Sequence, residues 1–357
     1  MSWENVTGVK YINIWTGYSD TTQGHLFVNG NHQLLLTAGI TFNLKSGTTE
    51  GPTQDEVAQA LSLINNQDGG PLKYLAVVDE NIYTALYDPN HVQAEPVANP
   101  DSAGDGIYDY TFQWYVNSST AINKGFWSEG VALKLVYSTD GSNSVVVDTS
   151  VHGSSTKANV TVCCYQPVLY GNKGENRINI SISSKQVASS DCSDKAGNFN
   201  HAGDTFIVYW VYIDDSYFKL FNFDGCTDPD PDVVHQGFYI HKEKSTVEWD
   251  HVFNSFFPNV KCGAFDFSTQ VAVRSGPDQS YPVVVTEQIT VHQQENQITF
   301  ISGFSSAQGL KYAGEVDKRQ AVLAYDQFGN STYFLVHTTY DYKSDGDSGH
   351  IVMLSVS

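Results

Sequence analysis

Four carboxylates lie close together in one acidic, proline-containing stretch of the chain. Within nine residues stand Asp224, Asp228, Asp230 and Asp232. Ca²⁺ prefers about six to eight oxygen ligands, which aspartate carboxylates and loop carbonyls supply. The spacing does not match an EF-hand, and the prolines between the acids also suit an extended, solvated loop. The stretch therefore predicts a Ca²⁺ site at these four aspartates, with ordinary turn chemistry as the alternative.

A second polar stretch, 189–204, adds amide and imidazole side chains that suit sugar hydroxyls. The predicted ligand-binding residues are Asn198, Asn200 and His201 from this stretch, together with Asp228 and Asp230. The two stretches flank the apolar segment 205–223, which we interpret as a buried hairpin with Asp214 and Asp215 at its turn. Connections on either side of one hairpin leave the same end of a sheet. We therefore expect the two loops to lie together.

Two other residue patterns bear on catalysis and metal binding. A glycosidase needs two carboxyl groups about 5 to 10 Å apart, and several acidic pairs flank aromatic strands. Three histidines in and after a β-type segment could indicate a metal site, but no carboxylate or thiol stands at an established metal-ligand spacing from them. We assign no catalytic residue. These acidic pairs and histidines are Asp79 with Glu80, Asp214 with Asp215, Glu248 with Asp250, and His235, His241 and His251.

Charge and composition restrict the partners. The formal net charge of −20 repels phosphate backbones, so we expect no nucleic-acid binding. No apolar run approaches the length of a transmembrane helix, and no ordinary secretory signal peptide is visible at the start of the chain. Charged residues make up 16% and aromatic residues 13%, a composition that favours half-buried, pleated surfaces.

The five cysteines have no zinc-type spacing, and buried free thiols are the simplest interpretation. One disulfide among Cys192, Cys226 and Cys262 is the alternative. For the adjacent pair Cys163 and Cys164, we expect two thiols on opposite faces of a strand.

Several elements must position these groups. Asn29-Gly30 between apolar runs predicts a hairpin over 25–44 with a type I′ turn. Thr53 and Glu56 form a capping box, and an apolar stripe at helical spacing predicts a helix of about three turns near 54–64. Strands with turn residues between them follow at 72–78, 81–87, 108–116, 131–137, 144–148 and 159–165, and then past Pro167.

The expected fold is all-β, with two antiparallel β-sandwich-like domains of jelly-roll or Greek-key type and one short helix. Strand candidates are similar in number on both sides of Pro167. The predicted domains are therefore 1–166 and 167–357.

Three function classes fit this fold. The first is a non-enzymatic recognition protein, lectin-like, adhesin-like, or a toxin or tail-fibre component, which binds a glycan or cell-surface receptor outside the cell that makes it. The second is a self-assembling structural or inclusion-type β protein, which would be a homo-oligomer. The third is a glycoside hydrolase. The first class is our leading hypothesis, because long polar loops and aromatic side chains on a rigid β scaffold suit sugar recognition.

Overall fold

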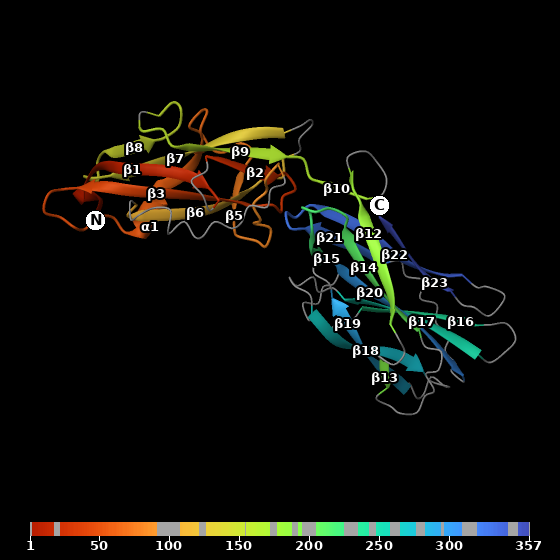
Figure 1. Cartoon of the computed structure of the whole chain (residues 1–357). Helices are drawn as coiled ribbons and strands as arrows, with labels where there is room; N and C mark the ends of the chain where they lie inside the picture. The colour runs from red at the N-terminus through yellow and green to blue at the C-terminus, as the bar shows by residue number, and fades with distance from the viewer. Residues whose placement is uncertain are drawn as a thin grey trace. The chain divides into compact units, whose positions relative to one another are not determined.

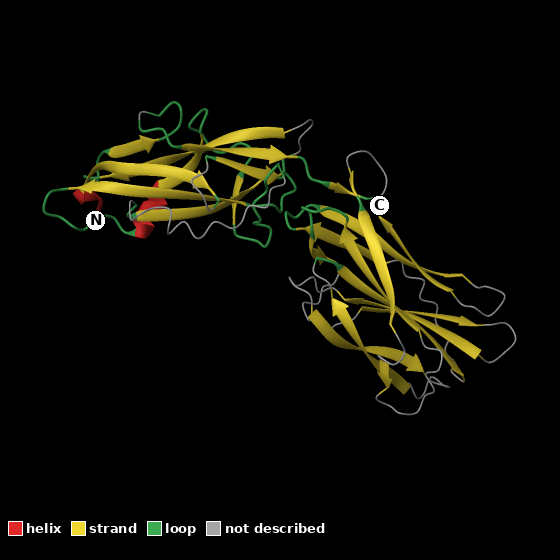
Figure 2. Ribbon diagram, in the orientation of Figure 1, coloured by secondary structure: helices red, strands yellow, loops and turns green. Residues whose placement is uncertain are grey.

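The structure is a computed structural model in which most described residues lie in β-strands (Figures 1 and 2). It describes residues 2–17, 22–90, 108–120, 126–153, 155–171, 177–187, 192–194, 205–224, 235–242, 248–257, 265–275, 283–293, 296–308, 320–341 and 349–356. Side chains are described within these ranges up to residue 183, and then at 210–222, 296–297 and 323–333. The predicted all-β, sandwich-like fold is confirmed.

Contacts between Cα atoms divide the chain into two compact units, which are described separately. The first contains Met1–Pro167 and Phe328–Asn330, and the second contains Val168–Gln327 and Ser331–Ser357. Whether each unit folds by itself, as two domains would, stays a prediction.

The first unit is built from two sheets that face each other (Figure 2). One has the strand order β1-β3-β6-β5, and the other the order β2-β9-β7-β4, with β8 also paired to β7. The bounds of its elements are a 3₁₀ turn η1 (Ser2–Asn5), β1 (Val6–Thr16), β2 (Gln23–Phe27), β3 (Leu34–Leu44), α1 (Gln54–Ala60), β4 (Leu61–Asn65), β5 (Ala76–Val78), β6 (Tyr110–Asn117), β7 (Phe126–Ser138), β8 (Ser144–Asp148) and β9 (Asn159–Tyr165).

The core of this unit lies between the two sheets. Along the strands of both sheets, every second side chain points into the core, as expected for half-buried strands. Ile14, Ala38 and Phe112 come from the first sheet and Leu133 and Val162 from the second. β3 is buried on both faces, since its first nine residues are all buried. Other residues therefore also pack on the face of β3 that points away from the core.

The predicted hairpin over 25–44 is wrong. β2 pairs in parallel with β9, whereas β3 pairs with β1 and β6, so the two strands belong to different sheets. Gly30 has φ +78°, but the one described non-glycine residue with positive φ is Asn296, so this is not a type I′ turn. The Asn29 carboxamide oxygen instead accepts the backbone N–H groups of Asn31 and His32, at 2.9 and 2.8 Å. Asn29-Gly30 is a corner that carries the chain from one sheet to the other.

The predicted helix is present but shorter than expected. Its capping box is confirmed, because the Thr53 hydroxyl accepts from the Glu56 N–H and the Glu56 carboxylate accepts from the Thr53 N–H. The helix ends at Ala60, and Leu61–Asn65 forms β4 on the edge of β7. Val57 is buried in the core. Strand pairing at the sheet edge overrides the apolar helical stripe beyond Ala60.

Thr53→Ala should lower the free energy of unfolding by about 1 kcal/mol, because the cap accepts an N–H that has no partner inside the helix. Thermal denaturation of the variant measures this loss. The matched control is Thr156→Ala, which removes the same atoms from an exposed threonine. Equal melting midpoints for the two variants would contradict the capping role.

Other predicted strands of the first unit have mixed outcomes. The turn residues Asp140-Gly141 between the predicted strands 131–137 and 144–148 predict a hairpin, which is confirmed because β7 pairs with β8 and Gly141 has φ +76°. Hydrogen bonds from Asn143 and Ser142 lower the pKa of the Asp140 carboxyl to about 2. β9 has the predicted bounds. The strand predicted at 81–87 is absent, and the one at 72–78 is reduced to β5.

The second unit consists mainly of three antiparallel sheets, with the orders β12-β14-β20-β17-β16, β13-β19-β18 and β15-β21-β22-β23. A short parallel pair, β10 and β11, accompanies them. The bounds are β10 (Leu169–Tyr170), β11 (Arg177–Ile178), β12 (Ile180–Val187), β13 (Cys192–Asp194), β14 (Thr205–Ile213), β15 (Leu220–Asp224), β16 (His235–Lys242), β17 (Glu248–Phe257), β18 (Phe265–Ser275), β19 (Val283–Gln293), β20 (Ile298–Gln308), β21 (Gln320–Asp326), β22 (Ser331–Asp341) and β23 (Gly349–Val356).

The predicted hairpin over 205–223 is also wrong. β14 pairs with β12 and β20, whereas β15 pairs with β21 in another sheet. Asp215 forms the corner between them, since its carboxylate accepts the N–H groups of Tyr217 and Phe218 at 2.7 and 2.9 Å. The argument that loops 189–204 and 224–232 leave the same end of a sheet therefore loses its basis.

Among the described residues, no helix is long and apolar enough to cross a membrane.

Candidate functional site

The sheet β1-β3-β6 presents a face that points away from the core, called here the outer face. Backbone register places its residues in rows across the three strands. Asn13, Gly39 and Thr111 form the central row, and Trp15, Thr37 and Gln113 form the next. On the other side of the central row, Tyr11 pairs with Thr41. Neighbouring strands lie about 4.8 Å apart, and residues two apart along a strand lie about 7 Å apart. These side chains therefore form one continuous patch.

Tyr108, which precedes β6, covers the centre of this patch at Gly39. A Cβ atom built on Gly39 would lie 2.4 Å from Tyr108 Cγ and 2.7 Å from both Cδ atoms. Because the two Cδ distances are equal and slightly longer than the Cγ distance, the missing Cβ points at the face of the ring and not at its edge. The tyrosine thus lies flat on a glycine in the middle strand, and any side chain at position 39 would displace it.

Trp15 and Thr37 lie beside this ring. The Trp15 and Tyr108 rings are stacked, with centroids 5.7 Å apart and an interplanar angle of 29°. Trp15 is buried, and Thr37 is fully buried with a hydroxyl that has no hydrogen-bond partner among the described residues. The aromatic pair and the glycine beneath it hold Tyr108 in one orientation while leaving it half-buried. This ring is called here the aromatic platform.

Polar and aromatic side chains surround the platform. Asn13, Thr111 and Gln113 are exposed, and Tyr11 is 48% exposed with the Lys10 ammonium 5.1 Å from its ring centroid. The carboxamides of Asn and Gln both donate and accept hydrogen bonds. A flat ring flanked by such groups can stack on the C–H face of a pyranose while the amides bind its hydroxyls. The outer face therefore combines one half-buried aromatic ring with hydrogen-bond donors and acceptors beside it.

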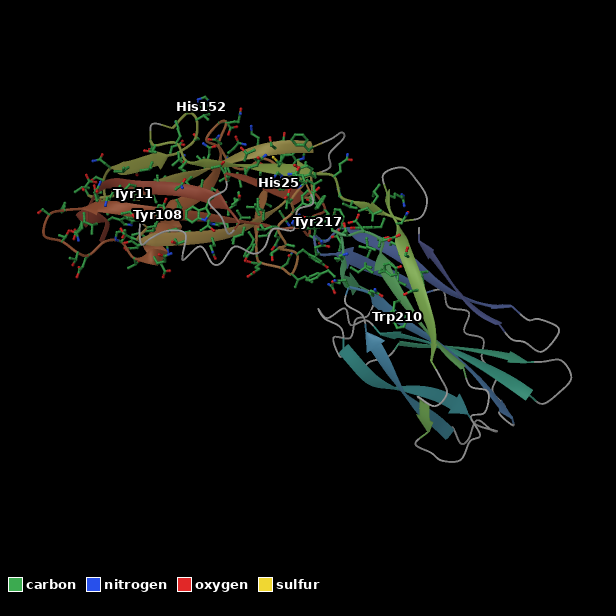
Figure 3. All side chains as sticks on the ribbon, in the orientation of Figure 1. Tyr11, His25, Tyr108, His152, Trp210 and Tyr217 are labelled. Carbon is green, nitrogen blue, oxygen red and sulfur yellow. The ribbon has the colours of Figure 1, made fainter. Side chains whose placement is uncertain are left out.

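A second aromatic group lies on the outer face of the other sheet, around His25 (Figure 3). Phe27, Tyr165 and Phe126 share one register row, and the Tyr165 hydroxyl is 3.1 Å from His25 Nδ1. Burial lowers the pKa of His25, and the Asp88 carboxylate opposes this shift. The rings of Tyr87 and Phe328 pack on Phe27. Most of this group is therefore internal packing, with Phe126 as its exposed margin.

The ligand-binding and metal residues predicted from the sequence are not brought together by described residues. Asn198, Asn200, His201, Asp228, Asp230 and Asp232 lie outside them. Asp224 ends β15, where its backbone pairs with Leu323, and its side chain is not described. In the part of the chain that is described, no group of three or more His, Cys, Asp or Glu side chains is placed to hold a metal ion. The Ca²⁺ site at the four aspartates stays a prediction.

The described acidic pairs have structural partners. Glu80 accepts from the Tyr115 hydroxyl at 2.6 Å, and Asp214 accepts from the Ser181 hydroxyl at 3.3 Å. Asp215 caps the corner described above. The side chains of Glu248, Asp250, His235, His241 and His251 are not described. The described pairs therefore give no support to a two-carboxylate hydrolase.

Two cysteines are described with their side chains. Cys163 and Cys164 are free and buried, and Cys164 faces the core. Burial raises the pKa of the Cys164 thiol. Both are buried free thiols, as predicted. Cys226 and Cys262 lie outside the described residues, and the side chain of Cys192 is not described, so a disulfide among these three stays a prediction.

No protein-family model matches the chain, and a comparison with curated proteins finds no similar sequence.

Sequence reasoning missed the outer face because of one residue. Alternation predicts that Tyr108, Tyr110, Phe112 and Trp114 share a face. Tyr110, Phe112 and Trp114 do pack on the core, but β6 begins only at Tyr110, and Tyr108 lies over Gly39. The Asp109 N–H donates to the Ile40 carbonyl at 3.1 Å, and the regular pairing of β6 with β3 ends at Tyr110. A glycine in the middle of an apolar strand was the available signal, since such glycines mark close approach of another group.

Proposed function

We propose that this protein is a non-enzymatic recognition protein that binds a glycan on the outer face of β1, β3 and β6. The observation that carries this proposal is the Tyr108 ring lying flat on Gly39 between exposed polar side chains. A preformed aromatic platform loses little conformational freedom when a ligand stacks on it. The net charge of −20 is compatible with a neutral sugar and unfavourable for polyanions. The expected setting is outside the cell that makes the protein, where such receptors meet their ligands.

A glycan array with the full chain tests this proposal, run with and without Ca²⁺ because the acidic loop 224–232 stays a candidate metal site. Tyr108→Ala should weaken binding about tenfold or more, because it removes the stacking surface. Tyr333→Ala is the matched control, since it removes an exposed tyrosine of the other unit, 54% exposed. Gln113→Ala provides a second variant, because this exposed side chain contributes little to packing.

Three outcomes would contradict the proposal. An array without any bound glycan would remove its basis, and light scattering that showed self-association would then favour the assembly hypothesis. Binding that Tyr108→Ala and Gln113→Ala leave unchanged would place the site elsewhere, with loop 224–232 as the next candidate. Hydrolysis of chromogenic glycosides would favour the glycosidase hypothesis.

A further inference from the structure

We infer that the outer face contains two aromatic subsites, at Tyr108 and Tyr11, and that its ligand is an oligosaccharide and not a single sugar. The inference rests on the proposed function and adds the number of sugar units that the face recognises. The two tyrosines come from different parts of the chain (Figure 3).

The two tyrosines lie at diagonal positions of the same sheet face. Tyr11 on β1 is opposite Thr41 on β3, and Tyr108 covers Gly39, two residues along β3 on the same face. Diagonal neighbours on one face are about 7–8 Å apart, which is within reach of aromatic side chains. The two rings therefore stand on neighbouring positions, with Asn13 next to Tyr11 along β1.

Each ring also keeps an accessible surface. The Lys10 ammonium lies over the Tyr11 ring at 5.1 Å from its centroid, yet Tyr11 remains 48% exposed. Tyr108 has one face against Gly39 and remains half-buried. The exposed surface of each ring is available for a ligand to cover. A sugar that stacks on Tyr108 can thus be followed by a second unit that stacks on Tyr11.

The alternative for Tyr11 is a solvent-exposed residue that Lys10 alone holds in place. That alternative predicts no contribution of Tyr11 to ligand affinity. It differs from the two-subsite arrangement in one measurable respect, the dependence of affinity on the number of sugar units. Additional units gain affinity only if a second subsite binds them.

Isothermal titration calorimetry on the full chain measures this dependence. The probes are the methyl glycosides of glucose, galactose and mannose and their β-1,4-linked di- and trisaccharides. For the wild-type chain, we expect the affinity of the preferred series to rise about tenfold from the monosaccharide to the longer probes. Tyr11→Ala should reduce this gain to less than about twofold. Tyr333→Ala, the control, should keep the full gain.

The outcomes separate the inference from the proposed function. A wild-type chain that binds the monosaccharide as tightly as the trisaccharide would overturn the two-subsite arrangement and leave glycan recognition standing. The same holds if Tyr11→Ala retains the full gain. If Tyr108→Ala leaves the affinity for every probe unchanged, the proposed site is wrong. If the wild-type chain binds no probe, both the proposed function and the two-subsite arrangement are wrong.

Discussion

Replacing Glu129 by Gln is expected to lower the free energy of unfolding by about 3 kcal/mol. Glu129 lies on β7 and is 3% exposed, yet it bears a carboxylate. One carboxylate oxygen accepts from Asn65 Nδ2 and from the Lys73 N–H, both at 2.7 Å. The other accepts from the N–H groups of Tyr74 and Leu75, at 3.0 and 3.1 Å. Three consecutive backbone amides and one side-chain amide therefore converge on a single buried group.

Glutamine retains the shape of this side chain but replaces one acceptor oxygen by a donor. One buried and one part-buried N–H group then lose their acceptor and face an NH₂ group, whichever way the amide is oriented. A buried donor left without an acceptor costs about 1–3 kcal/mol, and bonds to charged groups lie at the upper end. The segment 73–75, which leads into β5, should detach first because its amides depend on Glu129.

Urea denaturation of the full chain measures the effect, and hydrogen exchange at the amides of residues 73–75 locates it. Glu80→Gln is the matched control, since it makes the same chemical change at an exposed acid with a hydrogen bond from the Tyr115 hydroxyl. Its expected cost is below about 1 kcal/mol. Equal effects of the two variants would show that the four hydrogen bonds to Glu129 contribute little.

Acidification from pH 6.5 to pH 4 is expected to remove about 3 kcal/mol of stability through His32 alone. Its side chain is 1% exposed. Nδ1 accepts the Phe27 N–H at 3.0 Å, and Nε2 lies 2.9 Å from the Ala85 carbonyl, which makes the Nε2–H tautomer the one that satisfies both. The ring also packs on Phe27 and Phe328. Protonated imidazole has no acceptor for the Phe27 N–H.

The direction of the pH effect follows from the pKa. Burial lowers the pKa of His32 from 6.5 to about 4, against a smaller opposing effect of the hydrogen bond to Ala85. Between these values the unfolded chain binds a proton that the folded chain does not, so acid favours unfolding. The stabilisation is complete above pH 6.5 and disappears as the pH falls to about 4. The interval between the two pKa values, at about 1.4 kcal/mol per pH unit, gives about 3 kcal/mol.

His32→Gln provides the comparison, because glutamine does not titrate. The variant should be less stable than the wild-type chain at pH 7.5 and should approach it at pH 4. Other groups, including His25 whose pKa is also lowered, contribute equally to both chains and cancel in the difference. Parallel curves of unfolding free energy against pH for the two proteins would contradict a neutral, buried His32.

The sequence alone determined those features that a few neighbouring residues decide. The capping box of Thr53 and Glu56 needs one helical turn, and the Asp140-Gly141 hairpin needs only a glycine with positive φ and adjacent β-forming residues. β9 was predicted with its bounds because its alternation is uninterrupted. The all-β class follows in the same way from many such local signals.

Only the tertiary structure decided which strand pairs with which. Asn29-Gly30 is compatible with a hairpin or with a corner between sheets. The corner forms because the preceding strand β2 pairs in parallel with β9, which lies far along the chain. The burial of Glu129 and the position of Tyr108 on Gly39 likewise depend on residues distant in sequence. Local propensity acts through backbone conformation and nearest-neighbour hydrogen bonds. The outer face exists because long-range packing brings β1, β3 and the residue before β6 together, and that arrangement has no signature within any one stretch of the chain.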